Sequence, residues 1–215
     1  MSKKQDDDKN ITTFKLITLG DSGVGKTSIL KRFVIGRFEE RIINTIGFTS
    51  SSKDITLKNG TKVRLKLIDT AGQEQYQALA KTYIKNAEGV LFVFSHDKKE
   101  SFDNIKKWLD NFRENNFNFD FNKTFPAYLV GNKCDLEKVI KKEEIEQVKA
   151  ENNFYGYIDT SAKDDIGINK LFEEIAEMLI NAYGKKKGGY SVKLSSASGP
   201  EKKKKGCDLL CGSDL

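Results

Sequence analysis

The chain has 215 residues, a net charge of +6, and 38% hydrophobic against 32% charged residues. This length fits one globular domain plus a tail, and no apolar run is long enough to predict a membrane-spanning helix. The N-terminus lacks the apolar segment of a secretory signal. Three cysteines make no disulfide framework, so we expect a cytoplasmic protein.

The positive charge is concentrated near the C-terminus. Residues 184–215 hold eight Lys against three acidic residues, a net of +5, so the remaining 183 residues carry only about +1. A basic tail of this kind does not predict a nucleic-acid-binding domain. We divide the chain into a flexible N-terminus (1–12), a folded domain (13–183) and a disordered basic tail (184–215).

Short apolar runs alternate with helical patterns along the folded domain, which favours an α/β fold with a mostly parallel sheet. Residues 54–68 alternate apolar and polar on both sides of Asn59-Gly60, so we expect a hairpin and one antiparallel strand at the sheet edge. Residues 114–122 are interpreted as a loop. In chain order, the predicted elements are a strand at 14–19, a helix over 28–33, the hairpin, a strand at 89–94, a helix over 101–112, a strand at 127–130, a helix over 141–152, a strand at 154–158 and a helix over 168–179.

A phosphate-binding motif follows the first strand. Residues 20–27 read G-D-S-G-V-G-K-T and match G-x-x-x-x-G-K-[ST] between a strand and a helix. Glycines let successive N–H groups turn inward around an anion, and the helix adds the positive end of its dipole. We expect Lys26 to reach the β- and γ-phosphates and the Thr27 hydroxyl to bind Mg²⁺. The motif does not distinguish ATP from GTP; its predicted contacts are Ser22, Gly23, Val24, Gly25, Lys26, Thr27 and Ser28.

Two further motifs indicate a guanine site. Residues 132–135 read N-K-C-D after a strand, and the Asp135 carboxylate can accept hydrogen bonds from N1–H and the 2-amino group of guanine, which adenine does not offer. An unmet carboxylate would penalise ATP. Residues 160–163 read T-S-A-K and can close the pocket with backbone N–H groups near the guanine oxygen. An ordinary polar loop is the alternative for either motif alone; the predicted base contacts are Asn132, Lys133, Asp135, Ser161, Ala162 and Lys163.

Residues 69–74 read D-T-A-G-Q-E at the end of the hairpin and supply a predicted catalytic and metal site. Asp69 can hold Mg²⁺ through water, and the Gly72 N–H can reach the γ-phosphate. Gln73 is the predicted catalytic residue because its amide can orient the attacking water. Thr45, in the loop before the hairpin, can complete the Mg²⁺ shell, so the predicted metal residues are Thr27, Thr45 and Asp69.

These five motifs, in this order, resemble the small GTPases of the Ras superfamily, most closely its Rab branch, over residues 14–183. The resemblance implies a P-loop NTPase G domain with a mostly parallel six-stranded sheet, one antiparallel edge strand and five flanking helices. It implies Mg²⁺ as cofactor, GTP as substrate and GDP as product, and a monomeric core. It also places the Phe38 ring against guanine and implies two nucleotide-sensitive loops, at about 38–47 and 71–83.

The resemblance implies a slow GTPase switch that an activating protein can accelerate about 10³–10⁵-fold. Exchange factors and effectors are expected on the two loops. Rabs direct vesicle traffic, but Phe48-Thr49-Ser50 and Ile68 replace residues usual in Rabs. A Ras-like signalling GTPase, or a GTP-binding scaffold with little turnover, therefore remains an alternative. We assign no chemistry to His96, the only histidine.

The tail has the features of a membrane anchor. Lys202 to Lys205 precede Cys207 and Cys211, and a polybasic run beside a lipidated cysteine gives a two-signal anchor. The ending C-G-S-D-L is one residue too long for C-a-a-X, and the cysteine spacing is not the one usual in Rabs. Prenylation at Cys207 or Cys211 is expected, with an unmodified tail as the alternative. We therefore expect a cytoplasmic protein that associates peripherally with the cytosolic face of membranes.

Overall fold

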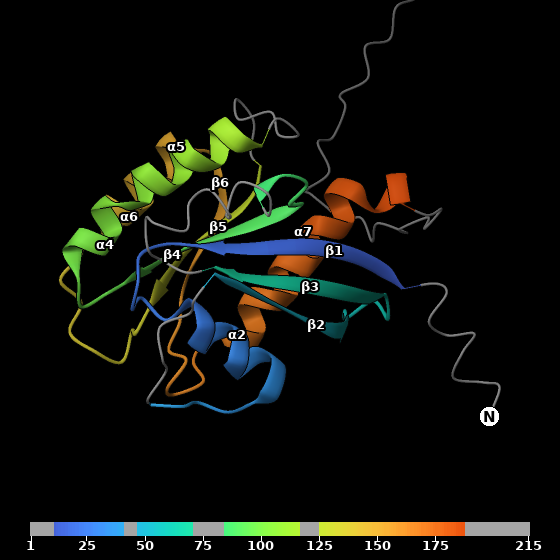
Figure 1. Cartoon of the computed structure of the whole chain (residues 1–215), viewed down its shortest axis with the longest axis horizontal. Helices are drawn as coiled ribbons and strands as arrows, with labels where there is room; N and C mark the ends of the chain where they lie inside the picture. The colour runs from blue at the N-terminus through green and yellow to red at the C-terminus, as the bar shows by residue number, and fades with distance from the viewer. Residues whose placement is uncertain (1–10, 41–46, 71–83, 117–124, 188–215) are drawn as a thin grey trace, which may run out of the picture.

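A six-stranded sheet forms the centre of the computed structural model, which describes residues 11–40, 47–70, 84–116 and 125–187 (Figure 1). Its strand order is β2-β3-β1-β4-β5-β6. Five strands are mutually parallel, and β2 pairs antiparallel with β3 at one edge, as the sequence predicts. The strands are β1 (Thr12–Leu19), β2 (Phe48–Thr56), β3 (Lys62–Thr70), β4 (Gly89–Ser95), β5 (Phe125–Asn132) and β6 (Phe154–Asp159).

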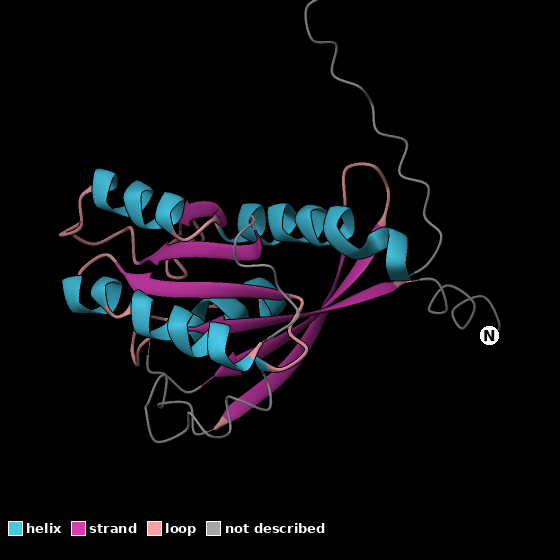
Figure 2. Ribbon diagram, turned by 90° about the horizontal axis from the view of Figure 1, so that it is seen from above, coloured by secondary structure: helices cyan, strands magenta, loops and turns pink. Residues whose placement is uncertain are grey.

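Helices cover both faces of the sheet, and each face has its own hydrophobic core (Figure 2). Alternate residues of β4 point to opposite faces, so Val93 enters one core and Phe94 the other. One core lies beneath α2 and α7, where the rings of Phe33 and Phe172 stack with centroids 3.7 Å apart. The other lies beneath α4, α5 and α6. The helices are α2 (Lys26–Ile35), α4 (Lys99–Asp103), α5 (Ile105–Asn115), α6 (Lys142–Glu151) and α7 (Ile168–Lys187).

Within the described residues, α4 and α5 follow one another and are separated only by Asn104. The five helical segments therefore form four helical units, close to the five helices that the resemblance implies. Helix α5 ends at Asn115, so the stretch interpreted as a loop begins two residues too early, and its residues 117–122 lie outside the described part. Helix α7 continues to Lys187, past the position where the sequence analysis ends the folded domain.

The β2–β3 hairpin is longer than its alternating pattern. Strand β2 begins at Phe48, well before residue 54, because it continues through a polar stretch that lies mostly exposed at the sheet edge. The connection is a turn in which the Gly60 N–H donates to the Leu57 carbonyl at 2.8 Å. Gly60 has φ 81°, a conformation that glycine adopts without strain, and Asn59 caps the turn by accepting from the Thr61 N–H at 3.0 Å.

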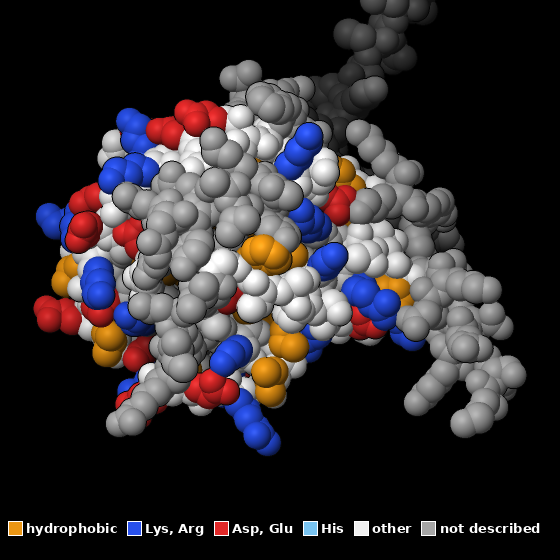
Figure 3. All heavy atoms as spheres, in the orientation of Figure 1, with side chains coloured by type: hydrophobic (Ala, Val, Ile, Leu, Met, Phe, Trp, Pro, Cys, Tyr) orange, Lys and Arg blue, Asp and Glu red, His pale blue; other side chains and the backbone are white. Residues whose placement is uncertain are grey.

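The surface agrees with the nearly balanced charge of the folded part. On the face shown in Figure 3, basic and acidic side chains are interspersed among the described residues. Among the helices described, none combines the length and apolar character needed to cross a bilayer.

Candidate nucleotide-binding site

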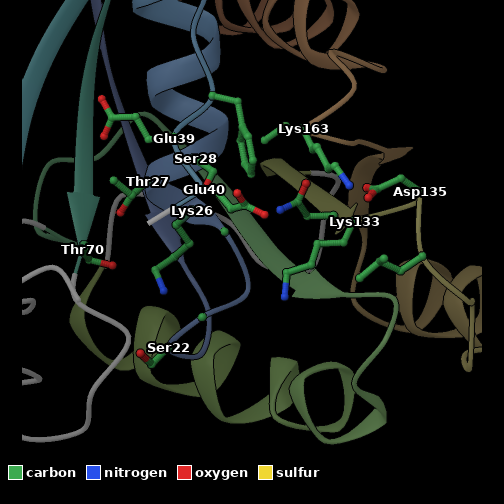
Figure 4. A pocket seen from close by; sticks show the side chains of 16 residues that line it. Ser22, Lys26, Thr27, Ser28, Glu39, Glu40, Thr70, Lys133, Asp135 and Lys163 are labelled. Carbon is green, nitrogen blue, oxygen red and sulfur yellow. The ribbon is translucent and has the colours of Figure 1, made fainter. Parts of the chain in front are cut away.

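The carboxyl ends of the parallel strands meet at one edge of the sheet, and the loops that follow them enclose a cavity of about 400 Å³ (Figure 4). In Figure 4, Asp135 and Lys163 lie at one end of this cavity and Thr27 and Thr70 at the other. The lining residues are Ser22, Gly23, Gly25, Lys26, Thr27, Ser28, Phe38, Glu39, Glu40, Thr70, Asn132, Lys133, Asp135, Leu136, Ala162 and Lys163.

The loop between β1 and α2 is tightly built. Gly25 has φ 97° and directly precedes α2; a Cβ there would lie 2.2 Å from Nδ2 of Asn132, so a side chain has no space. Lys26 begins the helix, and its Nζ donates to the carbonyls of Gly20 at 2.8 Å and Asp21 at 2.6 Å. Burial lowers the pKa of the Lys26 ammonium to about 8, although the carboxylates of Asp69 and Asp21 act in the opposite direction. The loop thus presents a buried cation and a helix N-terminus to the cavity.

Helix α5 and the residue before it hold this loop from outside. The indole N–H of Trp108 donates to Oδ1 of Asp21 at 2.7 Å. The side-chain amide of Asn104 donates to Oδ2 of the same carboxylate at 2.8 Å. Asn104 is also the residue at which α4 gives way to α5. Both oxygens of Asp21 are therefore fixed by the segment that follows β4.

Side-chain oxygen atoms of α2 and β3 lie close together where the start of α2 approaches the end of β3. The Thr27 hydroxyl donates to Oδ2 of Asp69 at 2.6 Å. The next residue, Thr70, donates its hydroxyl to the Thr18 carbonyl at 2.6 Å, which fixes the end of β3 against β1. A hydroxyl and a carboxylate therefore lie side by side where α2 and β3 approach the cavity.

Asn132 connects the two ends of the cavity. Its side-chain amide donates to the Val24 carbonyl of the phosphate-binding loop at 2.8 Å. Its amide oxygen accepts from the Thr160 hydroxyl at 3.2 Å. Asn132 is buried, so these bonds join three loops in a place where water does not compete for them.

The loop after β5 carries the predicted base contacts. Lys133 has φ 59°, and its Nζ lies 3.7 Å from Oδ1 of Asp97, so its side chain is held at its far end. The Cys134 N–H donates to the Thr160 carbonyl at 3.0 Å and ties this loop to the loop after β6. Asp135 is half-buried and lines the cavity.

The buried side chain of His96 belongs to a polar cluster next to these loops. His96 Nε2 lies 2.6 Å from Oδ1 of Asp159, and the Lys138 ammonium donates to Oδ2 of the same carboxylate at 2.8 Å. The Tyr157 hydroxyl also donates to Asp159. Burial alone would raise the pKa of Asp159, but these partners outweigh it and hold the pKa well below its usual range. The backbone N–H of His96 donates to the backbone carbonyl of Asn132 at 2.9 Å. This bond connects the cluster to Asn132, a residue that lines the cavity.

The Ras family model matches residues 15–181 of this sequence, which include every strand from β2 to β6 and most of β1. The chain belongs to the Ras family. This Ras-family protein is a small GTPase, an enzyme that binds GTP and GDP and hydrolyses GTP. Its six-stranded sheet with one antiparallel edge strand is the sheet that the resemblance implies.

The small GTPase is similar to Rab proteins over most of its length. It is 37% identical to Ras-related protein Rab-10 of Diplobatis ommata, over 90% of this chain and 95% of that protein. It is 32% identical to Ras-related protein Rab-13 of Rattus norvegicus, over 85% and 88%. It is 37% identical to GTP-binding protein ypt3 of Schizosaccharomyces pombe, over 75% and 73%. These relatives support a divergent Rab-like GTPase that acts with regulators and effectors.

Most of the predicted contact residues of this GTPase line its cavity. Val24 and Ser161 do not: they are buried behind the lining, where the Val24 carbonyl accepts from Asn132 and the Ser161 hydroxyl accepts from the Asp164 N–H at 3.0 Å. Asp69 does not line the cavity either, but its carboxylate accepts a hydrogen bond from Thr27, which does. The predicted residues outside the described part are Thr45, Gly72, Gln73, Cys207 and Cys211.

Four lining residues were not predicted: Glu39, Glu40, Thr70 and Leu136. Thr70 and Leu136 each directly follow a predicted residue, so adjacency could have indicated them. Glu39 forms an ion pair with Lys31 at 2.6 Å, and Glu40 lies beside it. Charged residues in a loop are too common for the sequence to single these two out.

Proposed function

We propose that this GTPase is a Rab-type switch that cycles between GDP- and GTP-bound forms and regulates vesicle traffic. Similarity to a Rab-10 protein across nine tenths of the chain supports the proposal. The nucleotide-binding part of the proposal rests on one cavity, which is lined by Lys26 and Thr27 at one end and by Asp135 and Lys163 at the other. That separation suits a ligand with a phosphate chain and a purine at opposite ends.

In the proposed binding mode, the phosphates lie against the backbone N–H groups of residues 22–28 and the Lys26 ammonium. Guanine lies at the other end, with its N1–H and 2-amino group donating to Asp135. The backbone of residues 161–163 faces the guanine oxygen. The Lys133 stem and the Phe38 ring cover the faces of the base; both residues line the cavity.

The residues at the phosphate end fit Mg²⁺. The Thr27 hydroxyl and the Asp69 carboxylate lie 2.6 Å apart, and hard oxygen ligands are those that this ion prefers. We assign Thr27, Thr45 and Asp69 to it, with Asp69 acting through water. When bound, the ion would neutralise charge on the β- and γ-phosphates.

Hydrolysis and switching are assigned to residues outside the described part. Gln73 orients the attacking water, and Thr45 and Gly72 hold the loops at about 38–47 and 71–83 to the γ-phosphate. Loss of that phosphate releases both loops, which changes the surface that effectors bind. We expect slow intrinsic turnover, accelerated about 10³–10⁵-fold by a protein that supplies an arginine.

Membrane association is assigned to the tail after the folded domain. Lys202 to Lys205 would contact anionic lipid at about 1 kcal/mol for each lysine near the surface. A lipid on Cys207 or Cys211 would supply the second signal. In the proposed organisation, a flexible N-terminus (1–12) precedes a G domain (13–183), and a disordered basic tail (184–215) follows it, except that α7 continues to Lys187.

Single-turnover hydrolysis tests the enzymatic part of the proposal. The protein is loaded with GTP, and phosphate release is followed with and without Mg²⁺. Gln73→Leu should lower the rate at least tenfold, whereas Gln147→Leu, at an exposed amide on α6, should not. Wild-type protein that retains GTP for hours without releasing phosphate would point to the scaffold alternative.

Two further measurements test the cellular role. Affinity capture with the GTP-loaded Gln73→Leu form should recover vesicle tethering or motor proteins that the GDP-loaded form does not. Recovery of signalling kinases instead would favour the Ras-like alternative. Mass spectrometry of the native C-terminus should find a lipid on Cys207 or Cys211, and an unmodified tail on membrane-free protein would contradict the anchor.

A further inference from the structure

Arg32, in the last turn of α2, bonds to a loop 130 residues away along the chain. Its Nε donates to the Ala162 carbonyl at 2.7 Å, and its Nη2 donates to the Lys163 carbonyl at 2.8 Å. Its Nη1 donates to the Gly36 carbonyl at 3.0 Å, just past the end of its own helix. All three partners are backbone carbonyls, so the planar fork of the guanidinium serves here to fix a loop conformation.

These bonds set the direction of two successive peptide units. In a trans peptide the C=O and the following N–H point in opposite directions, and the described residues contain no cis peptide. Because the Ala162 carbonyl points at Arg32, the Lys163 N–H points away from Arg32. The next N–H, of Asp164, donates to the Ser161 hydroxyl at 3.0 Å. The Ala162 and Lys163 carbonyls therefore lie on the side of α2, while the same two residues line the cavity.

Helix α2 also carries the phosphate end of the site. Lys26 and Thr27 form its first turn, and Arg32 lies six residues after Lys26, about 9 Å along a helix. The helix is anchored in the core by Phe33, whose ring stacks on Phe172 of α7. One rigid element thus holds the phosphate contacts at its start and the base loop near its end.

We propose that Arg32 is a positioning residue for guanine recognition: by holding the Ala162 and Lys163 carbonyls, it aims the Lys163 N–H at the 6-oxo group of guanine. This inference rests on the proposed base site. Arg32 acts through the loop and does not touch the nucleotide. Asp135 is proposed to accept from N1–H and the 2-amino group, which are different atoms of the base. Nucleotides altered only at position 6 can therefore separate the effect of Arg32 from that of Asp135.

The test compares GDP with 6-thio-GDP, in which a sulfur, a weak hydrogen-bond acceptor, replaces the 6-oxygen and the groups facing Asp135 are kept. Both are measured by competition against a fluorescent GDP. The variants are Arg32→Met, which removes the fork, and Arg32→Lys, which keeps the charge but cannot hold both carbonyls in one plane. Arg64→Met is the matched control, since Arg64 bonds to Asp54 on the β2–β3 hairpin at 2.6 Å, and neither residue lines the cavity.

Wild-type protein should bind GDP more tightly than 6-thio-GDP. In both Arg32 variants the ratio of the two affinities should fall about fivefold to tenfold, because the variants lose affinity for GDP. Arg64→Met should keep the wild-type ratio. Equal losses for both ligands in the Arg32 variants, with a lower melting temperature, would assign Arg32 a purely structural role and overturn the inference. Wild-type protein that binds both ligands equally would instead refute the proposed base site. If Arg32→Met does not fold, an unchanged ratio in Arg32→Lys overturns the inference by itself.

Discussion

The hydroxyl of Thr27 and the carboxylate of Asp69, 42 residues apart in the sequence, lie 2.6 Å from each other. This contact joins the first turn of α2 to the end of β3. It brings together two of the three residues assigned to Mg²⁺, although they come from separate motifs. The first prediction tests this pair.

Thr27→Asn should weaken Mg²⁺-dependent retention of GTP at least tenfold more than retention of GDP. An amide in place of the hydroxyl removes an ion ligand where the triphosphate most needs its charge neutralised. Nucleotide dissociation rates with and without Mg²⁺ measure the effect. Thr27→Ser keeps the hydroxyl and should behave as wild type. Equal losses of GTP and GDP in Thr27→Asn would count against the assignment.

Asp135→Asn should change the preferred base from guanine to xanthine. The amide can donate to the oxygen that xanthine carries in place of the 2-amino group, whereas guanine would then face a donor. Affinity for GDP should fall about 100-fold, and affinity for xanthosine diphosphate should rise. Glu137→Gln, an exposed carboxylate two residues further on, is the control and should change neither. Unchanged affinity for GDP in Asp135→Asn would refute the base assignment.

Trp108→Phe should destabilise the protein by about 2 kcal/mol, because the variant keeps an aromatic ring but removes a donor to the Asp21 carboxylate. Urea unfolding measures the change. A double-mutant cycle with Asp21→Ala should give a coupling of about 1–2 kcal/mol. The control cycle pairs Trp108→Phe with Asp54→Ala on the hairpin and should give a coupling near zero. No coupling between positions 108 and 21 would show that the hydrogen bond contributes nothing to stability.

Asp159→Asn should lower stability in a pH-dependent way. The pKa of Asp159 is lowered in the folded protein, so its ionised form stabilises the fold above the unfolded-state pKa of about 4. The stabilisation is lost as pH falls through that value toward the folded-state pKa. Because the side chain is 38% exposed, we expect a difference on the order of 1 kcal/mol above pH 5.

Urea midpoints of wild type and Asp159→Asn between pH 5 and pH 3 give this profile. The gap between the two proteins should close as pH falls. Asp165→Asn, at an exposed residue with φ 59° that asparagine tolerates, should show no such gap. A gap that stays constant to pH 3 would contradict the ionic origin of the effect.

The sequence predicts those parts of the site that are formed by contiguous sequence motifs. Lys26 and Thr27 follow a glycine-rich string between a strand and a helix, and Asp135 lies in a four-residue motif after a strand. The order of these strings along a parallel sheet is enough to bring them to one edge, because successive parallel strands end on the same side.

The contacts that hold these strings in place could not be predicted in the same way. Arg32 bonds to a loop 130 residues away, and Trp108 bonds to a residue 87 positions away. An arginine in a last helical turn and an aromatic residue on an apolar stripe both have ordinary structural explanations, so neither residue type predicts its partner. The start of β2 was also missed, because a strand exposed at the sheet edge has little apolar alternation to detect.

Trp108 is the only tryptophan in the chain, and its indole N–H is committed to a carboxylate of the phosphate-binding loop. Indole emission depends on the local electric field and on that hydrogen bond. The native protein therefore carries an intrinsic optical probe one hydrogen bond away from the loop against which the phosphates are proposed to bind. Its unlabelled fluorescence should report loading and release in real time, without a dye on either the protein or the ligand.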